Sequence, residues 1–517
     1  MSSSSRSCAG SDPAPRARLA RRAFLALAVV AMAAAQAAPR AWETVEEQWY
    51  RLSLGGQPCG WFHEKVERSG DTVRTSGETQ MTVGRMGQGV TIRTATSFEE
   101  TAKGEPIRAE IRKDSGAAPV TATWTFRDGG IDVEEEQGGR RTRQRRPLPP
   151  AGWLAPRAAD EFVRRRIAAG AKEIRYSTLD PESGPEAVSV ESELVGASTA
   201  TVGGRTVPVT EWRTRNSLIE RPSSEFISSD GVLVRSATDL GVGILESRLS
   251  TKDEATAPIA PVEVMARTFI ALDADGRALG GARRAELAVR AKDGRLAELP
   301  SSGAQRFERT DAASGIVRVD ADTGSKATPA EASDARFARA SVVADAADPE
   351  IRALAERVLK GVPDSPVAKA DALRAAVFRH LSRKNLASGF ATASECVRSR
   401  AGDCTEHAVL LCALLRTQGI PARVASGLLY VAEAGAVRNS YGWHMWTQAL
   451  IDGSWVDLDA VLPGSVRFDA SHVLTGTSPA DGGSLDTDLA RIVDLMGDTE
   501  IEVRSIDGRP AAKGAKR

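Results

Sequence analysis

Apolar and polar residues alternate with a period of two through much of the first half of the chain. In residues 90–98 the even-numbered positions carry Val, Ile, Thr, Thr and Phe, and residues 120–126 repeat the pattern, as expected for half-buried strands. The turn signals Asp128-Gly129-Gly130 and Asp230-Gly231 separate such stretches, as in β-hairpins. The pattern predicts an antiparallel sheet, with a short helix around residues 157–169.

The apolar period changes from strand-like to helical at Asp348. Apolar residues then recur at steps of three and four, through Leu354 and Val358 and again over residues 370–381, which predicts two helices. A shorter helical stretch, residues 392–399, precedes Cys404.

A further helix is predicted to begin at Cys404. Ala408, Leu411, Cys412 and Leu415 form one apolar stripe, and the helix is expected to end near Gly419 and Pro421. Beyond it, residues 443–450 and 455–459 alternate like two strands joined by the turn Asp452-Gly453.

Two segments carry little chemical signal. Residues 263–345 are rich in Ala, Asp, Gly, Arg and Ser, and we interpret them as a small β-containing connecting unit. The arginine cluster within residues 140–146 follows Glu134, Glu135 and Glu136, so a solvated strand or loop opposite these acidic neighbours is favoured over a polyanion site.

Composition sets the class of protein and excludes one class of partner. Hydrophobic residues make up 42% and charged residues 26% of 517 residues, which is typical of globular proteins and, at roughly 150 residues per domain, indicates about three folded units. Lys+Arg and Asp+Glu are both 68, for a net charge of +0. No long-range field therefore favours nucleic acid, and no nucleic-acid partner is expected.

Residues 1–37 are interpreted as an export signal. Arginines up to Arg22 precede an apolar run over residues 23–35 that is shorter than the roughly 20 residues of a membrane span, and cleavage is expected before Ala38. Arg21-Arg22 also fits a twin-arginine signal, so the Sec and twin-arginine routes both stay open, as does retention of the leader as an anchor. No later window is apolar enough to cross a membrane, so the mature protein is predicted to be periplasmic or secreted, without a permanent span.

Among the cysteines, Cys404 has the sequence surroundings expected of a reactive thiol. Cleavage would remove Cys8 and leave Cys59, Cys396, Cys404 and Cys412, which allow three disulfide pairings. Cys404 opens a predicted helix, where the dipole can lower a thiol pKa from ~8.5 to roughly 3.5–7.5. The polar flank Asp403, Thr405 and Glu406 argues against a buried core cysteine, whereas Cys396 and Cys412 fit that role.

A thiolate nucleophile needs a proton carrier, for which histidine is suited. His444 lies on the first predicted strand after the cysteine helix, and a carboxylate from the second strand would hold its ring. His407 lies on the helix of Cys404 and is poorly placed to reach across a substrate. His472 is assigned a packing role.

These motifs resemble the transglutaminase-like superfamily. The resemblance rests on Gly402 to Ala408 (GDCTEHA), Leu415-Arg416, Gly419 to Arg423 (GIPAR), Gly442 to Trp446 (GWHMW) and Trp455 to Asp459 (WVDLD), and it covers about residues 348–477. It implies a cysteine helix packed on an antiparallel sheet and a thioester formed from an amide carbonyl. It assigns Cys404 as nucleophile, His444 as proton shuttle and Asp459 as the group that orients His444.

Two departures affect the assignment of the carboxylate. The family often has Asp-Pro after the last strand, where this chain has Asp459-Ala460. Asp457 lies on the same strand face as Asp459, but Asp459 keeps the family's spacing from Trp455 and is preferred. The oxyanion donor is left unassigned, although the Cys404 backbone N–H is an obvious contributor at a helix start.

The sequence thus predicts an α+β multidomain protein with candidate catalytic residues Cys404, His444 and Asp459, acting on a protein or peptide substrate that could belong to the cell envelope. The thioester could pass to an amine or to water, and the sequence does not choose. No EF-hand loop, paired CxxC or HExxH occurs, so no cofactor or metal is expected. The alternative is a non-catalytic envelope-binding or assembly protein on an inactive scaffold. Oligomeric state is not indicated.

The predicted divisions are a signal peptide, 1–37; an antiparallel β-rich domain, 38–262; the connecting unit, 263–345; a transglutaminase-like (papain-like) catalytic domain, 346–480; and a C-terminal extension with a polar tail, 481–517.

Overall fold

The computed structural model of the protein describes residues 41–511, apart from 86–87, 116–118, 219–220, 241–242, 264–267, 384–390, 435–436 and 482–498. The predicted signal peptide with Cys8, part of the predicted C-terminal extension and the polar tail lie outside the described residues. Among the helices in the described ranges, none combines the length and apolar character needed to cross a membrane.

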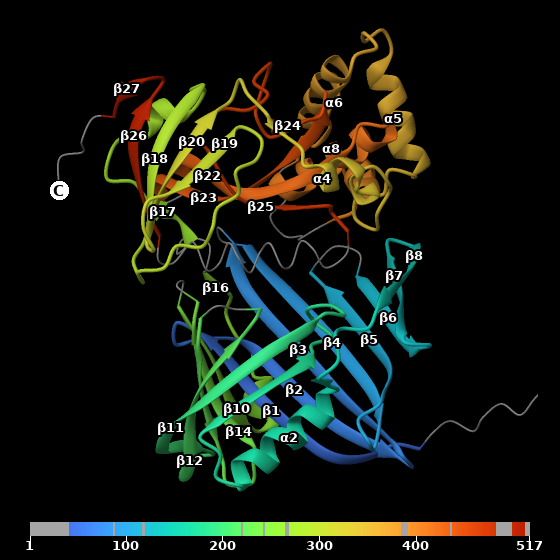
Figure 1. The fold of residues 1–517 in the computed structure, drawn as a ribbon, viewed down its shortest axis with the longest axis vertical. Coiled ribbons are helices and arrows are strands. Elements are labelled where there is room, and N and C mark those ends of the chain that lie inside the picture. The colour runs from blue at the N-terminus through green and yellow to red at the C-terminus, as the bar shows by residue number, and fades with distance from the viewer. Residues whose placement is uncertain are drawn as a thin grey trace, which may run out of the picture. The chain divides into compact units, whose positions relative to one another are not determined.

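The N-terminal half forms one large, mostly antiparallel sheet (Figure 1). Its strands follow the order β8 to β1, then β15 to β9, and β16 adds to β3 in parallel. The strands are β1 Glu43–Leu54, β2 Gln57–Ser69, β3 Thr72–Arg85, β4 Gln88–Thr101, β5 Pro106–Asp114, β6 Val120–Arg127, β7 Gly130–Gln137, β8 Arg140–Pro147, β9 Trp153–Leu154, β10 Glu173–Leu179, β11 Ala187–Val202, β12 Arg205–Asn216, β13 Ser223–Ile227, β14 Leu233–Asp239, β15 Ile244–Ser250 and β16 Val262–Glu263.

The turn residues explain why these strands pair with their neighbours in sequence. Asp128 and Gly129 between β6 and β7 both have positive φ, 49° and 69°, the conformation of a two-residue hairpin turn that matches strand twist. Both predicted hairpins are present, because β13 also pairs with β14 across Asp230-Gly231. The predicted helix is α2, Pro156–Ala168, with proline at its first position, and a short α3, Lys252–Ala255, follows β15.

The arginine cluster lies on strand β8, opposite the acidic strand β7. Arg141 contacts Glu134 and Glu136 at 3.0 and 2.8 Å, and Arg145 contacts Asp132 at 2.8 Å. The prediction of a solvated strand facing acidic neighbours is confirmed. Water screens such exposed charges, so these pairs contribute little to stability.

The described residues of the C-terminal half include four longer helices: α5 Pro349–Leu359, α6 Pro366–His380, α7 Ala393–Ser399 and α8 Cys404–Thr417. In each, the side chain of the residue before the first helical position accepts a backbone N–H: Asp348, Ser365, Thr392 and Asp403. These caps satisfy donors that would otherwise lack partners. The helices predicted from the apolar period are thereby confirmed.

Two sheets accompany these helices. One has the order β21-β24-β23-β22-β25, with β17 added to β23, and the other has the order β19-β20-β18-β26-β27. The remaining elements are β17 Ile270–Ala271, η2 Arg277–Leu279, β18 Arg284–Ala291, β19 Gln305–Arg309, β20 Ser314–Asp320, β21 Ser325–Lys326, α4 Pro329–Ser333, η3 Ala335–Phe337, β22 Ala422–Ala434, β23 Val437–Ile451, β24 Ser454–Leu458, β25 His472–Ser478, β26 Thr499–Ile506 and β27 Arg509–Pro510.

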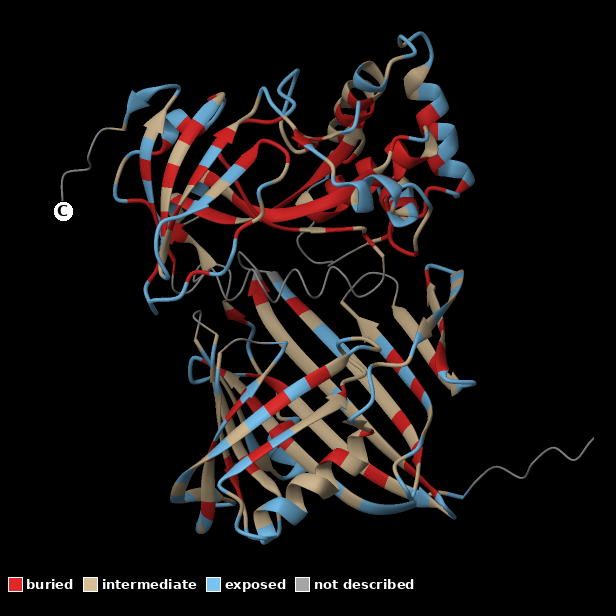
Figure 2. Cartoon of the chain, in the orientation of Figure 1, coloured by how far each residue is buried: buried red, intermediate tan, exposed pale blue. Residues whose placement is uncertain are grey.

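The sheet that contains β22 and β23 is buried on both faces. On one face Leu411 of α8 shares a core with Met445, and on the other face Trp446 and Val473 share a core with Leu287 of β18. Figure 2 shows these strands almost continuously buried, whereas most strands of the large N-terminal sheet are intermediate. Strands covered on both faces are expected to be apolar on both faces.

Helix α8 is buried on all sides, from Thr405 to Arg416. The single apolar stripe that the sequence predicted is therefore incomplete. The reason is that α8 is the central helix: α5, α6 and α7 pack against it as well as β22 and β23.

The second sheet is assembled from segments far apart in sequence. Strand β18 pairs with β20 on one side and with β26 on the other. The predicted connecting unit and the predicted C-terminal extension thus share one sheet. At the level of a β-rich N-terminal region followed by a C-terminal region that contains the main helices, the predicted fold class is confirmed.

Gly427 on β22 is a site where a single methyl group should disrupt this packing. A Cβ there would lie 2.0 Å from the Val473 backbone oxygen and 2.9 Å from the Trp446 ring. We expect Gly427→Ala to lower the free energy of unfolding by about 1–3 kcal/mol or more. Gly280→Ala is the control, because its Cβ would meet only the Arg277 oxygen at 3.7 Å. Urea unfolding of both variants checks this, and equal midpoints would contradict the expectation.

Candidate active site

Cys404 is the first residue of α8, and the start of this helix is fixed by reciprocal hydrogen bonds. The Asp403 carboxylate accepts from the Thr405 backbone N–H at 3.0 Å, and the Glu406 carboxylate accepts from the Asp403 backbone N–H at 2.9 Å. Gly402 is required beside them, since a Cβ there would lie 2.3 Å from the Glu406 Cβ. A thiol at this position lies at the positive end of the helix dipole, which favours a thiolate.

The polar residues around Cys404 are buried, although Cys404 itself is not a core residue, as its polar flank predicted. Asp403, Thr405 and Glu406 are all buried because the capping hydrogen bonds satisfy them inside the domain. Burial, together with the charge of Asp403, raises the pKa of Glu406 to about 8. Cys404 itself retains partial exposure.

The other described cysteines differ from Cys404 in exposure. Cys59, Cys396 and Cys412 are fully buried, and all four described cysteines are thiols rather than disulfides. Burial raises the pKa of Cys59 to about 11 and also raises the pKa values of Cys396 and Cys412. The core roles predicted for Cys396 and Cys412 are confirmed.

His444 and Asp459 are brought together by adjacent strands. His444 lies on β23, which pairs with β24, and Asp459 is the residue after β24. His444 Nε2 lies 2.9 Å from Asp459 Oδ2, and both side chains are buried. Since a carboxylate only accepts, Nε2 carries the proton in this contact.

The position of Asp459 is fixed by several backbone contacts. Its Oδ1 accepts from the Val461 N–H at 2.8 Å, and its own N–H donates to the Arg467 carbonyl at 2.7 Å. The buried Arg374 of α6 donates to the carbonyls of Asp459 and Leu462, at 3.3 and 2.9 Å. The loop that carries the carboxylate is therefore held by the helical layer.

Asp459 is ionised in spite of its burial. Burial raises the pKa of this carboxyl, but the charges and hydrogen bonds of His444 and His472 more than offset burial and hold the pKa well below its usual range. A charged acceptor suits a residue that orients an imidazole.

The structure separates the two carboxylates between which the sequence left a choice. Asp457 accepts from Trp446 Nε1 at 2.7 Å, Gln448 Nε2 at 2.8 Å and the Ala304 N–H at 2.7 Å. Burial raises its pKa. Asp457 thus joins the two sheets, and Asp459 is the carboxylate that contacts His444.

Helix α8 runs in the same direction as β23 along the sheet. Thr447 Oγ1 donates to the Ala408 carbonyl at 3.0 Å, and the Leu450 N–H donates to the Pro421 carbonyl just beyond the helix, at 2.8 Å. Cys404, one turn before Ala408, therefore lies toward the part of β23 that carries His444, three residues before Thr447.

Two of the other four histidines, His407 and His472, have distinct environments. His407 Nδ1 donates to the Asp403 carbonyl at 2.6 Å within α8, and the side chain is buried. His472 opens β25, and its Nε2 lies 3.2 Å from Asp459 Oδ2, the oxygen that also contacts His444. The packing role predicted for His472 missed this contact. No motif in the sequence marks it, because it depends on the pairing of β25 with β22.

His444, Asp459 and His472 are also the residues with the donor types and spacing to hold a metal ion. Within the described residues, one possible ligand atom from each lies within 4.8 Å of the others. Imidazole and carboxylate suit zinc and similar ions. The hydrogen bonds that His444 and His472 make with Asp459 account for the same short distances.

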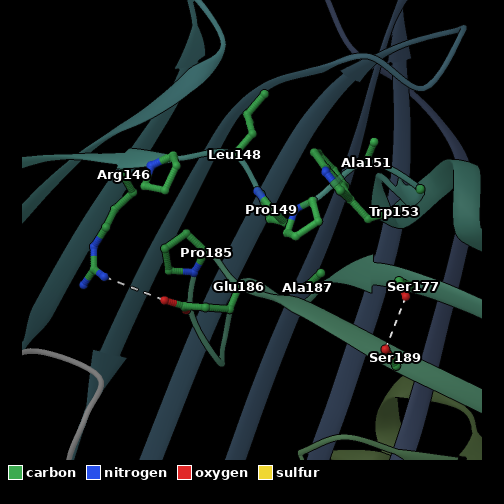
Figure 3. A pocket seen from close by; sticks show the side chains of 13 residues that line it. Arg146, Leu148, Pro149, Ala151, Trp153, Ser177, Pro185, Glu186, Ala187 and Ser189 are labelled. Atoms are coloured by element: carbon green, nitrogen blue, oxygen red, sulfur yellow. Dashed lines mark hydrogen bonds and ion pairs between the residues drawn. The ribbon is translucent and has the colours of Figure 1, made fainter.

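A separate pocket of about 590 Å³ lies in the β-rich region. Figure 3 shows it between the proline-rich segment that contains Leu148 and Pro149, the ring of Trp153, and Pro185 and Glu186 on the facing segment. Its lining contains none of the three predicted catalytic residues.

A cysteine at the start of a central helix, packed on a sheet with a buried His–Asp pair, is the arrangement of a thiol-enzyme fold. Residues 352–460 match the model of the transglutaminase-like superfamily. This part of the chain is a transglutaminase-like domain, as its motifs predicted.

Two of the solved structures that resemble the chain show how limited the similarity is. A "Beta-barrel-like Protein of Domain of Unknown Function" from Brucella abortus is 13% identical, covers 39% of this chain and 94% of its own, with a TM-score of 0.31. A "Putative Cysteine Protease" from Cytophaga hutchinsonii is 16% identical, covers 45% of this chain and 90% of its own, with a TM-score of 0.27. No curated protein matches the chain.

Proposed function

We propose that this protein is an exported thiol enzyme that acts on amide or peptide bonds, with Cys404 as nucleophile, His444 as proton carrier and Asp459 as the group that orients His444. The observation that carries the proposal is the buried 2.9 Å contact between His444 Nε2 and Asp459 Oδ2, in a domain whose central helix begins at Cys404.

The proposed reaction has two balanced stages. The Cys404 thiolate attacks the amide carbonyl carbon, a C–S bond forms, the C–N bond breaks, and the leaving amine takes a proton from His444. An amine or water then attacks the thioester, gives a proton to His444 and releases the Cys404 sulfur. Because Asp459 engages Nε2, Nδ1 is the ring nitrogen available for both proton transfers.

The proposed substrate is a protein or peptide, in keeping with the predicted export signal and a balanced net charge of +0. We assign the chemistry to the predicted catalytic domain, 346–480. To that unit we add the sheet of β18 to β20 and β26, because it forms one of the two cores against β22 and β23.

A second candidate function is binding without catalysis, and the 590 Å³ pocket of the β-rich region is the observation that favours it. Under that hypothesis the transglutaminase-like domain is an inactive scaffold, so Cys404 should react as an ordinary thiol.

Alkylation of Cys404 by iodoacetamide across pH separates the two functions. We expect rapid labelling well below pH 8 in the purified protein, and at least tenfold slower labelling in His444→Ala at the same pH, because the variant lacks the imidazole that supports the thiolate. Peptide mass spectrometry gives the rate at each cysteine. The buried Cys396 and Cys412 serve as slow internal references.

Labelling that follows an ordinary thiol, with the same rate in His444→Ala, would overturn the enzymatic proposal and leave the binding function.

A further inference from the structure

His472 is held between two carboxylates in the buried part of the site. Its Nε2 lies 3.2 Å from Asp459 Oδ2, and its Nδ1 lies 3.2 Å from Asp469 Oδ1 and 3.1 Å from the Asp469 carbonyl. The His472 side chain is only 1% exposed. Four side chains are thus linked by successive contacts in the order His444, Asp459, His472 and Asp469.

The contacts of this ring favour the imidazolium form. A neutral imidazole has one N–H and one acceptor nitrogen, yet Nε2 of His472 faces a carboxylate, and Nδ1 faces a carboxylate and a carbonyl oxygen, all of which only accept. The Ser471 hydroxyl also lies 3.4 Å from Nδ1, but it donates its proton to Asp469 Oδ1. In the imidazolium form both nitrogens donate. One positive charge then lies between two negative carboxylates, which makes its burial tolerable.

Asp469 is anchored independently of the catalytic residues. Its Oδ2 accepts from the Gly281 N–H at 2.8 Å, and its Oδ1 accepts from the Ser471 N–H at 3.1 Å. The ring of His472 is also fixed by packing, with the Phe468 ring centroid at 4.1 Å and the Trp446 ring edge-on at 5.2 Å. His472 therefore has one defined orientation toward Asp459.

Resting on the catalytic roles proposed above, we propose that His472, fixed by Asp469, is a positioning residue that holds the Asp459 carboxylate ionised and aimed at His444. Asp459 Oδ2 then receives hydrogen bonds from two imidazoles, one of which exchanges protons with the substrate while the other stays charged. His472 itself touches no reacting atom.

The charge on His472 has a consequence that does not depend on catalysis. Burial by itself lowers the pKa of this imidazole. The hydrogen bonds and charges of Asp459 and Asp469 have the larger, opposite effect and raise the pKa to about 9. The other titratable groups facing it are Asp457 of β24, whose charge interacts with it, and His444 of β23, whose ring centroid lies 5.6 Å away. A histidine that binds its proton more tightly when folded stabilises the fold fully below its unfolded pKa of ~6.5. That contribution is lost as pH rises to about 9.

The test compares His472→Gln and Asp469→Asn with wild-type protein, using His380→Gln as the matched histidine control. His380 Nε2 lies 2.9 Å from the Val397 carbonyl, and His380 is not one of the four linked side chains. Ring NMR of the wild type, with the His472 signals identified by their loss in His472→Gln, is expected to show both ring N–H groups beyond pH 8. The free energy of unfolding should fall more steeply between pH 6.5 and 9 in the wild type and in His380→Gln than in His472→Gln, in which the raised pKa of Glu406 still contributes a fall up to about pH 8.

The catalytic consequence is read from Cys404 alkylation. Asp469→Asn, which retains the shape of the side chain and does not contact His444, is expected to slow labelling about tenfold and to shift its pH profile, as loss of a partner that orients a functional histidine does in metal sites. Labelling in the presence of EDTA is expected to equal labelling without it.

The outcomes separate the two proposals. Slow Cys404 labelling in the wild type would overturn the proposed function together with this role. Fast wild-type labelling with an unchanged pH profile in both variants would overturn the role of His472 alone, as would a His472 ring that loses its proton near pH 6.5. A change in labelling on EDTA addition would replace the hydrogen-bonded arrangement with a metal site.

Discussion

Replacement of Cys404 by serine is expected to abolish amide turnover, with a loss on the order of 10⁴-fold or more. The serine hydroxyl would occupy the same helix start, but it ionises far less readily than a thiol, and His444 is oriented to serve a thiolate. Removal of a nucleophile from a catalytic set costs about as much as removal of the whole set. The measurement is ammonia release and incorporation of a fluorescent primary amine, with a glutamine-containing protein as substrate.

Cys412→Ala is the matched control for this prediction. Cys412 lies on the same helix, is fully buried and belongs to the core against the helices. Its removal should lower stability slightly while the folded protein keeps its turnover. Equal activity in Cys404→Ser and wild type would exclude Cys404 as the nucleophile, and the ratio of ammonia release to amine incorporation in the wild type would tell hydrolysis from transfer.

Asp459→Asn is expected to lower kcat by up to about 10⁴-fold, since the amide removes the charge that stabilises the imidazolium and can present a donor to Nε2. The variant should also lose the stability that comes from an ionised Asp459. A carboxyl whose pKa is lowered on folding stabilises the fold above its unfolded pKa of ~3.9, and that contribution disappears as pH falls through the lower folded value. In acid-unfolding measurements, the free energies of unfolding of wild type and variant should therefore converge at low pH.

Asp457→Asn provides the contrast. The three donors to Asp457 come from Trp446, Gln448 and Ala304, so its loss should weaken the join between the two sheets. We expect a lower free energy of unfolding, by about 1–3 kcal/mol, with kcat of the folded protein within tenfold of wild type. If Asp457→Asn instead lost as much kcat as Asp459→Asn, the assignment of Asp459 would fail.

Local patterns were sufficient to predict the elements that carry the candidate site. The apolar period located α5 and α6, the turn residues Asp452-Gly453 located the hairpin of β23 and β24, and the family spacing favoured Asp459 over Asp457. In each case the information lies within a few residues along the chain, where the geometry of helix, turn and strand is decided.

The features that the sequence did not reveal all depend on contacts between distant segments. The burial of Glu406 and its neighbours follows from packing of three other helices around α8. The approach of His472 to Asp459 follows from the pairing of β25 with β22. The pairing of β18 with β26 joins residues more than 200 positions apart. No local period encodes such contacts, and a lone histidine in a polar segment gives no sign of its partners.

The pairing of β18 with β26 also has a consequence for the order in which the protein folds. Residues Thr499–Ile506 follow β18 by more than 200 positions, yet they complete the sheet that covers one face of β22 and β23 and that meets Asp457 at Ala304. Until that strand pairs with β18, the cover on one face of the central sheet is incomplete, and pairing across so long a stretch of chain is slow. The sheet that supports the candidate site is therefore expected to be completed late in folding.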